Sequence, residues 1–293
     1  MEDEKLSPRD QRRKGEDEKQ WKLRVAVNRS LDRIRRKLLI FSGKGGVGKS
    51  TVAANLAVVL GLAGYRVGLL DIDFHGPSIP TLMGLAGRLL DTDGERAIPL
   101  VGPGGVKVVS IGLLIPDADQ AMIWRGPLKM GVINQLIGNT RWGDDDAARR
   151  GAEDDLDWLI IDSPPGTGDE PLSIAQTVVG AQGLLVTTPQ TLSTDDVRRS
   201  IGFARRVGMN VVGVIENMAG LVCPHCGGGI DLFKRGGGEK LSAELGVPFL
   251  GSVPLDPRAV EVGDSGKPMV LSLPDSPATQ ALLAAFKPIL DLA

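Results

Sequence analysis

Residues 37–51 read KLLIFSGKGGVGKST, and this stretch predicts a phosphate-binding loop at the carboxyl end of a buried strand. An apolar run at 38–41 is followed, after Ser42, by a segment of the form G-x-x-x-x-G-K-S. Glycines let successive backbone N–H groups turn toward phosphate oxygens, and the helix that starts near Lys49 adds its positive end to the same pocket. We therefore expect Lys49 to reach the β- and γ-phosphates of a nucleotide and Ser50 to hold Mg²⁺.

Lys44, immediately after the first glycine, is a second lysine that an ordinary phosphate loop does not require. Its presence makes the loop resemble the deviant Walker A loop of the MinD/ParA/nitrogenase iron-protein superfamily. In that superfamily the extra lysine crosses a dimer interface and contacts the nucleotide of the partner subunit. The resemblance therefore implies a homodimer, whereas the alternative is a solvated loop lysine.

The composition is typical of one large globular α/β domain, with 293 residues, 42% hydrophobic residues and a net charge of -2. This charge argues against a chain that coats nucleic acid or binds membranes through a polybasic surface. Residues 1–20 contain no apolar signal segment, and the apolar stretch 52–70 is interrupted by Asn55, Gly61, Gly64 and Arg66. Two cysteines imply no disulfide framework. We expect a soluble, cytoplasmic protein with no nucleic-acid and no membrane partner.

The chain is expected to divide into a charged tail at 1–36 and a single P-loop ATPase domain at 37–293 that carries the CxxC motif. Residues 1–15 are charged and predict disorder, and 21–36 predict a helix that packs on the domain or links to it. A membrane-surface helix is the alternative, but the apolar face is irregular. An acidic run at 144–146 predicts a solvated face rather than a metal site.

Three aspartates follow predicted buried strands. Asp71 and Asp73 come after the strand at 66–70, and Asp162 closes the apolar run at 156–161 in the manner of a Walker B motif. Carboxylates at the carboxyl edge of a parallel sheet lie where ligands bind, so we expect them to organise Mg²⁺ and to orient an attacking water. The alternative is a set of acidic cap or turn residues.

Strands and helices alternate along the chain. Further strands are predicted at 106–111, 183–187, 211–215 and 249–253, and a helix from Gly126 to about Ile137. This alternation predicts an α/β fold with a doubly wound, mainly parallel sheet and helices on both faces, as in SIMIBI-like P-loop NTPases.

The segment CPHC places Cys223 and Cys226 in a glycine-rich stretch after the strand that ends near Asn217. Two thiolates so close in sequence fit half a zinc site, a redox pair or half an iron–sulfur site. A cluster or a structural zinc commonly needs four protein ligands, and the chain has two cysteines. Two chains related by a two-fold axis would supply four thiolates.

Together these segments resemble the Mrp/ApbC family of iron–sulfur cluster carrier ATPases over about residues 37–270. The resemblance implies a homodimer with ATP sites near its interface and a labile four-iron–four-sulfur (4Fe-4S) cluster bridged by the two CxxC pairs. It implies delivery of that cluster to apo iron–sulfur client proteins, with cluster scaffold proteins as further partners. The motifs are GKGGVGKST, DIDFHGPSIPTLMG, WRGP, DSPPGTGDEPL, ENMAG, CPHCGG, FKRGGGEKLS and VPLDP.

The resemblance also assigns roles to single residues. Lys44, Lys49 and Asp73 would be catalytic, with Asp73 orienting the water. Ser50, Asp71 and Asp162 would lie near Mg²⁺, and Cys223 and Cys226 would hold the cluster. Asn217 would recognise adenine, and Pro254 and Asp256 would line the base. The full set of nucleotide contacts that it implies is Gly43, Lys44, Gly45, Gly46, Val47, Gly48, Lys49, Ser50, Thr51, Asn217, Pro254 and Asp256.

Two other functions share the same loop. A MinD/ParA-like positioning or regulatory ATPase would need a basic amphipathic tail or a basic DNA-binding surface, but residues 278–293 contain Lys287 as their one basic residue. That segment predicts a core-packing helix instead. A nitrogenase-type electron donor also bridges a cluster, but it does so with cysteines at separated positions. The CxxC pair therefore favours the cluster carrier.

Overall fold

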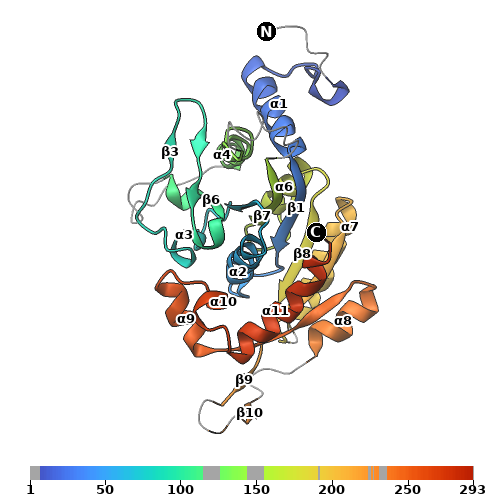
Figure 1. Ribbon diagram of the computed structural model, residues 1–293. Helices are drawn as coiled ribbons and strands as arrows, with labels where there is room; N and C mark the ends of the chain where they lie inside the picture. Colours follow the sequence, from blue (N-terminus) through green and yellow to red (C-terminus); the bar gives the residue numbers. More distant parts are fainter. Residues whose placement is uncertain are drawn as a thin grey trace.

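The computed structural model describes residues 7–114, 126–143, 155–190, 192–223, 226, 228–230 and 236–292. Its centre is a mostly parallel sheet (Figure 1). The described residues form nine strands of this sheet in the order β10-β9-β8-β1-β7-β2-β6-β5, with β11 paired to β9. Only the short edge strands β5 and β10 pair antiparallel within this sheet. The strands are β1 (Ile34–Phe41), β2 (Val67–Asp71), β5 (Leu100–Val101), β6 (Lys107–Ser110), β7 (Leu156–Asp162), β8 (Gln182–Thr187), β9 (Val211–Val222), β10 (Gly229–Ile230) and β11 (Phe249–Leu255).

Helices cover both faces of the sheet, which confirms the predicted fold class (Figure 1). Alternate residues of β1 enter two apolar clusters: Leu38 and Ile40 pack on one face, and Leu39 and Phe41 on the other. The first face is covered by α2 (Lys49–Leu62), α3 (Ile79–Leu82), α10 (Met269–Ser272) and α11 (Pro277–Leu290), with α9 (Pro257–Asp264) beside α3 and α10. The second is covered by α1 (Glu18–Asp32), α4 (Gly126–Gly138), α6 (Asp169–Thr177), α7 (Leu192–Arg206) and α8 (Gly237–Leu245).

The order of the strands decides where the site forms. β1 is followed along the chain by β2, but β7 lies between them and pairs in parallel with both. In this register Asp162 lies level with Ile40 on one side and with Asp71 on the other. The loop after β1 and the carboxylates of β2 and β7 therefore meet at one edge of the sheet.

The N-terminal helix begins and ends earlier than the sequence predicts. α1 starts after Asp17, whose side chain accepts a hydrogen bond from the backbone N–H of Gln20, and packs against α4. It ends at Asp32 because Ile34 already pairs with Leu156 in the sheet. Of the segment expected to be disordered, residues 1–6 lie outside the described residues. Residues 7–15 include a short 3-10 helix at Pro8–Asp10, whose Asp10 carbonyl accepts a hydrogen bond from the indole of Trp21.

The remaining segments agree closely with the pattern of the sequence. The excursion after α3 contains the hairpin of β3 (Asp91–Thr92) and β4 (Ala97–Ile98), followed by the 3-10 helices Pro103–Gly105 and Ile111–Leu113 around β6. α11 buries its apolar face in the core, as predicted. The acidic run at 144–146 lies outside the described residues. Among the helices of the described residues, none has both the length and the apolar character needed to cross a membrane.

Candidate nucleotide and cysteine sites

The glycine-rich loop joins Phe41, at the end of β1, to Lys49, at the start of α2. Gly48 has a φ of +84°, in the left-handed region, and a Cβ atom there would lie 2.1 Å from Nδ2 of Asn217. Only glycine fits this position. The loop is tied to its neighbours because the carbonyl of Ser42 accepts a hydrogen bond of 2.9 Å from the backbone N–H of Gly166, in the loop after β7.

Lys49 lies among the predicted carboxylates. Its side chain is buried, and Nζ lies 2.5 Å from Oδ1 of Asp162 and 4.0 Å from Oδ2 of Asp73. A buried ammonium needs a partner of opposite charge, and Asp162 supplies it in this structure. The structure therefore brings Lys49, Asp73 and Asp162 together, as the sequence predicts.

Asp71 is fully buried beside this group. Its Oδ1 accepts a hydrogen bond of 3.1 Å from the backbone N–H of Asp73, and its Oδ2 accepts one of 2.9 Å from the hydroxyl of Ser110. Burial, together with the nearby charge of Asp162, raises the pKa of Asp71 to about 8. Burial also raises the pKa of Asp162, against the opposing effects of the Lys49 charge and of hydrogen bonds from Lys49 and Ser50. A cation placed here would favour the ionised form of both carboxylates.

The chemistry of this group fits Mg²⁺. Oδ2 of Asp162 is buried and has no hydrogen-bond partner among the described residues, although buried polar atoms normally have one. The Ser50 hydroxyl, which hydrogen-bonds Asp162, is a second oxygen of the kind that this ion prefers. The described residues contain no group of three or more His, Cys, Asp or Glu side chains that could hold a metal ion without help. Mg²⁺ in proteins keeps several waters and is completed by phosphates of the substrate.

Lys44 has a partner within its own chain that the sequence did not reveal. Its Nζ donates a hydrogen bond of 2.9 Å to Oε1 of Gln190, which follows β8. β8 is the neighbour of β1 on the side opposite β7, so the end of β8 also reaches the loop edge of the sheet. In the sequence, a polar residue shortly after the predicted strand 183–187 is the signal that could have identified Gln190.

Asn217 contacts the phosphate loop itself. Its side-chain Nδ2 donates a hydrogen bond of 2.9 Å to the carbonyl of Val47. The next residue, Met218, has a φ of +59°, and it is the single non-glycine residue with positive φ in the described part of the chain. The sequence predicts that this strand ends near Asn217, and this prediction is wrong. In the structure β9 continues to Val222, because its distal half pairs with β10 and β11.

The two cysteines lie at the far end of β9. The backbone N–H of Cys223 donates a hydrogen bond of 2.9 Å to the carbonyl of Gly228, which closes the turn into β10. Cys223 is half-buried and Cys226 is exposed, and neither forms a disulfide bond. The β9–β10 end extends away from the helices that cover the sheet (Figure 1). Cys226 is thus accessible from outside the chain, and Cys223 is partly so.

A pocket of about 430 Å³ adjoins Cys223. Two of the three residues predicted to contact the base, Pro254 and Asp256, line it, whereas Asn217 is directed to the phosphate loop. Asp256 forms a 2.8 Å ion pair with Arg258, another lining residue, and hydrogen bonding from Arg258 lowers the pKa of Asp256.

Glu216 is a buried residue that the sequence reasoning missed. Its carboxylate accepts hydrogen bonds from the backbone N–H of Gly238, at 2.7 Å, and from the hydroxyl of Ser252, at 3.1 Å. It therefore fixes the start of α8 to β9, beside Asn217. The sequence contains a signal that could have identified Glu216, namely a glutamate directly after the predicted strand 211–215 together with a glycine-rich stretch before the next helix.

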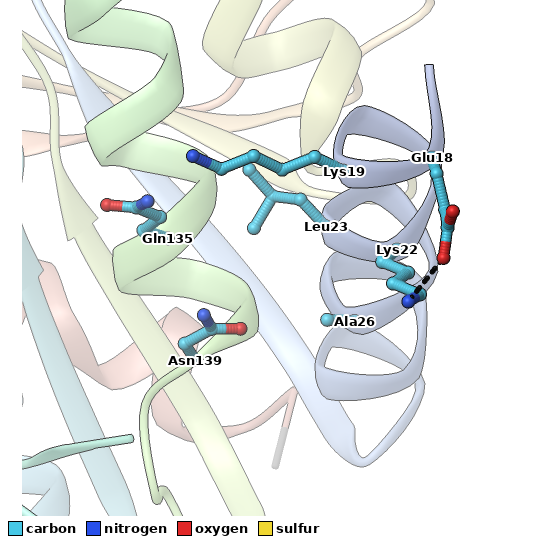
Figure 2. Close-up of a pocket in the computed structure, with 7 residues that line it drawn as sticks. All are labelled: Glu18, Lys19, Lys22, Leu23, Ala26, Gln135 and Asn139. Atoms are coloured by element: carbon cyan, nitrogen blue, oxygen red, sulfur yellow. Dashed lines mark ion pairs between the residues drawn. The ribbon is translucent and has the colours of Figure 1, made fainter. Parts of the chain in front are cut away.

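A larger depression, of about 620 Å³, lies apart from these groups, between α1 and α4 (Figure 2). Its lining holds the exposed ion pair of Glu18 with Lys22, at 2.6 Å, and the amides of Gln135 and Asn139. These side chains do not converge on one point, and the depression contains no nucleophile or paired acid. The chemistry of the described residues is concentrated at the phosphate loop and at the cysteine turn.

Comparison with known proteins assigns these features to a family. A family model described as ParA: NUBPL iron-transfer P-loop NTPase matches residues 33–290. An iron-sulfur cluster carrier protein of Saccharolobus solfataricus is 44% identical over 277 residues, which cover 94% of this chain and 89% of the relative. The cytosolic Fe-S cluster assembly factor NUBP2 of Homo sapiens is 42% identical, over 88% of this chain and 93% of its own length.

Solved structures agree with this assignment. A nucleotide-binding protein in complex with ADP from Archaeoglobus fulgidus superposes with a TM-score of 0.69 and 36% identity, over 83% of this chain and 91% of that chain. The cell division ATPase MinD of Pyrococcus furiosus superposes with a TM-score of 0.61 and 25% identity, over 88% of this chain and 100% of that chain. These findings confirm the resemblance to cluster carrier ATPases and the P-loop fold. The chain belongs to the family of NUBPL-type iron-transfer P-loop NTPases.

Proposed function

We propose that the protein is an ATP-hydrolysing carrier that binds a labile 4Fe-4S cluster between two copies of the chain and transfers it to apo-proteins. The observation that carries the proposal is the course of β9. The strand contacts the phosphate loop through Asn217 and reaches the cysteine turn at Cys223. One element therefore links the phosphate loop to the turn that carries the two cysteines.

Hydrolysis would use the charged group around Lys49. On nucleotide binding, the Lys49 ammonium would move from Asp162 to the β- and γ-phosphates, which would release Oδ1 of Asp162 from this ion pair. Ser50, Asp162 and Asp71 would hold Mg²⁺, which when bound neutralises charge on the phosphates. Asp73, 4.0 Å from Lys49, would orient the attacking water, and Lys44 of a second copy would contact the same phosphates.

The cluster is the cargo of this reaction rather than a resident cofactor. One chain offers two thiols, Cys223 and Cys226, and a four-iron cluster takes four. Two cysteine turns facing each other across a two-fold axis would complete the set. The names of the relatives, an iron-sulfur cluster carrier and a cytosolic Fe-S cluster assembly factor, support the same cargo.

Anaerobic reconstitution with iron and sulfide, followed by native mass spectrometry, tests the proposal. We expect a dimer with one four-iron cluster for the wild type and an iron-free protein for Cys226→Ser. Ile230→Ser is the matched control, because it places a hydroxyl at an exposed position of the same hairpin and leaves both cysteines in place. Absence of iron in the wild type, or one zinc ion bound within a single chain, would contradict the proposal.

A further inference from the structure

Lys129 of α4 contacts the loop that follows Asp73 and the first turn of α6, which the 163–168 loop joins to Asp162. Its Nζ lies 2.5 Å from Oε1 of Glu170 and 3.4 Å from Nε2 of His75, and it lies over the ring of Phe74, 5.4 Å from the centroid. Residue Lys129 is 7% exposed. Its ammonium is thus placed among three groups from two separate segments of the chain.

These contacts lie next to the residues of the proposed reaction. Phe74 and His75 directly follow Asp73, whose carboxylate lies 4.0 Å from Lys49. Glu170 is in the first turn of α6, and the loop 163–168 joins that helix to Asp162. Lys129 therefore connects the loop of Asp73 to the far end of the loop that Asp162 begins.

The energetics favour a fixed geometry. Burying a lysine ammonium costs free energy, which an ion pair with good geometry must offset. Glu170 is the carboxylate that pairs with Lys129. The start of α6 also favours the negative charge of Glu170. The cation–π contact with Phe74 adds attraction from the other loop. Moving either loop away from α4 would leave a buried charge without one of its partners.

We propose that Lys129 is a positioning residue for ATP hydrolysis, which sets the separation of the Asp73 loop and the 163–168 loop so that both meet the terminal phosphate together. The proposal rests on the proposed function, because it requires ATP hydrolysis at this site. It also gives a role to the segment after WRGP, which the sequence motifs left without one. The competing interpretation is a buried ion pair that contributes to stability alone.

The test compares Lys129→Met with wild type in three measurements: kcat, KM for ATP, and affinity for MgADP with and without aluminium fluoride. Misplacing the two loops should lower kcat by about tenfold or more, because small errors of position affect the transition state most. KM and the MgADP affinity should change by less than about twofold, while affinity for the aluminium fluoride complex falls in parallel with kcat. Lys129→Arg should recover part of the loss, because it keeps a cation between the loops.

Lys107→Met is the matched control, since Lys107 is a half-buried lysine on β6 whose Nζ donates to the carbonyl of Trp142, away from both loops. It should leave kcat unchanged. If Lys129→Met does not fold, Glu170→Gln removes the same ion pair from its more exposed side and should lower kcat in the same way. A lower melting temperature with wild-type kcat and wild-type affinity for the aluminium fluoride complex would overturn the proposal. If the wild type itself does not hydrolyse ATP, the proposed function is contradicted as well. The wild type alone decides that point, so this failure is distinguishable from a failure of the proposal for Lys129.

Discussion

The side-chain amide of Asn217 donates a hydrogen bond to the carbonyl of Val47, 2.9 Å away, and so attaches β9 to the phosphate loop. The contact joins residues 170 positions apart in the sequence. It also explains the glycine at position 48, because the amide occupies the space of a Cβ atom there. The shape of the loop therefore depends on β9.

Replacing Asn217 should weaken nucleotide binding. Asn217→Leu keeps the approximate size of the side chain but removes the donor to Val47, so the loop loses a fixed point. We expect the dissociation constant of MgATP to rise about tenfold, which corresponds to about 1.4 kcal/mol. Isothermal titration calorimetry measures it, and Asn210→Leu, at an exposed position just before β9, is the control. Equal affinity of both variants would show that this hydrogen bond does not shape the loop.

Lys49 and Cys223 should have separable roles. Lys49→Ala removes the cation expected on the phosphates and should abolish hydrolysis. Cys223→Ser changes a residue at the far end of β9 and should leave basal hydrolysis largely intact, while cluster binding is lost. Phosphate release and iron content of the two purified variants, with melting temperatures to verify folding, provide the comparison. Equal loss of hydrolysis in both would contradict this division.

Asp71 should make the nucleotide-free protein less stable as pH rises. Its pKa is about 8 in the folded chain and 3.8 as its ordinary value. Between about pH 4 and pH 8 the unfolded chain has released this proton while the folded chain retains it. The contribution of Asp71 to the free energy of unfolding therefore falls as pH rises through that window, and it is constant outside it. The raised pKa of Asp162 acts in the same direction.

Urea denaturation at pH 5 and pH 8 checks this expectation. Asp71→Asn should reduce the difference in unfolding free energy between the two values. Asp157→Asn is the control on β7, because hydrogen bonding from Arg66 lowers the pKa of Asp157 and moves its titration below this window. If the difference in unfolding free energy between pH 5 and pH 8 is the same in Asp71→Asn as in the wild type, Asp71 is ionised in the folded protein.

Gln190 should oppose the action of Lys44 on a second subunit. The hydrogen bond of 2.9 Å between them has to break before Lys44 can reach another nucleotide. Gln190→Ala should therefore tighten the dimer formed with a non-hydrolysable ATP analogue by about fivefold, if the bond contributes about 1 kcal/mol. Sedimentation velocity over a range of concentrations measures it, with Gln135→Ala on α4 as the control. A weaker or unchanged dimer would exclude this competition.

The sequence predicted the centre of the site because its parts obey a local rule. Asp71 and Asp162 each stand at the end of a buried parallel strand, and Lys49 follows the loop after a third. Such strand ends meet at one edge of the sheet whichever strands are neighbours. The doubly wound sheet follows from the same alternation of strands and helices. Neither prediction needed a knowledge of distant side-chain contacts.

The contacts that were missed depend on how distant segments pack. The residues around Lys129 in the sequence are those of an ordinary surface lysine on a helix. It is buried because α4 packs against the loop after Asp73 and against the start of α6. The partners of Gln190 and Glu216 come from other segments of the chain, which only the packing brings beside them. The continuation of β9 past Asn217 requires pairing with β10 and β11, which the pattern of the strand alone does not contain.

The left-handed backbone of Met218 has a consequence for motion. A bulky residue held at positive φ costs of order 1–3 kcal/mol, and surrounding contacts must maintain it. Met218 lies between the amide that grips the phosphate loop and the turn that carries the thiols. Relaxing the backbone torsion of Met218 would release this strain. A change in the direction of β9 therefore costs the least free energy at Met218. We expect any bending of β9 between the phosphate loop and the cysteine turn to occur at Met218.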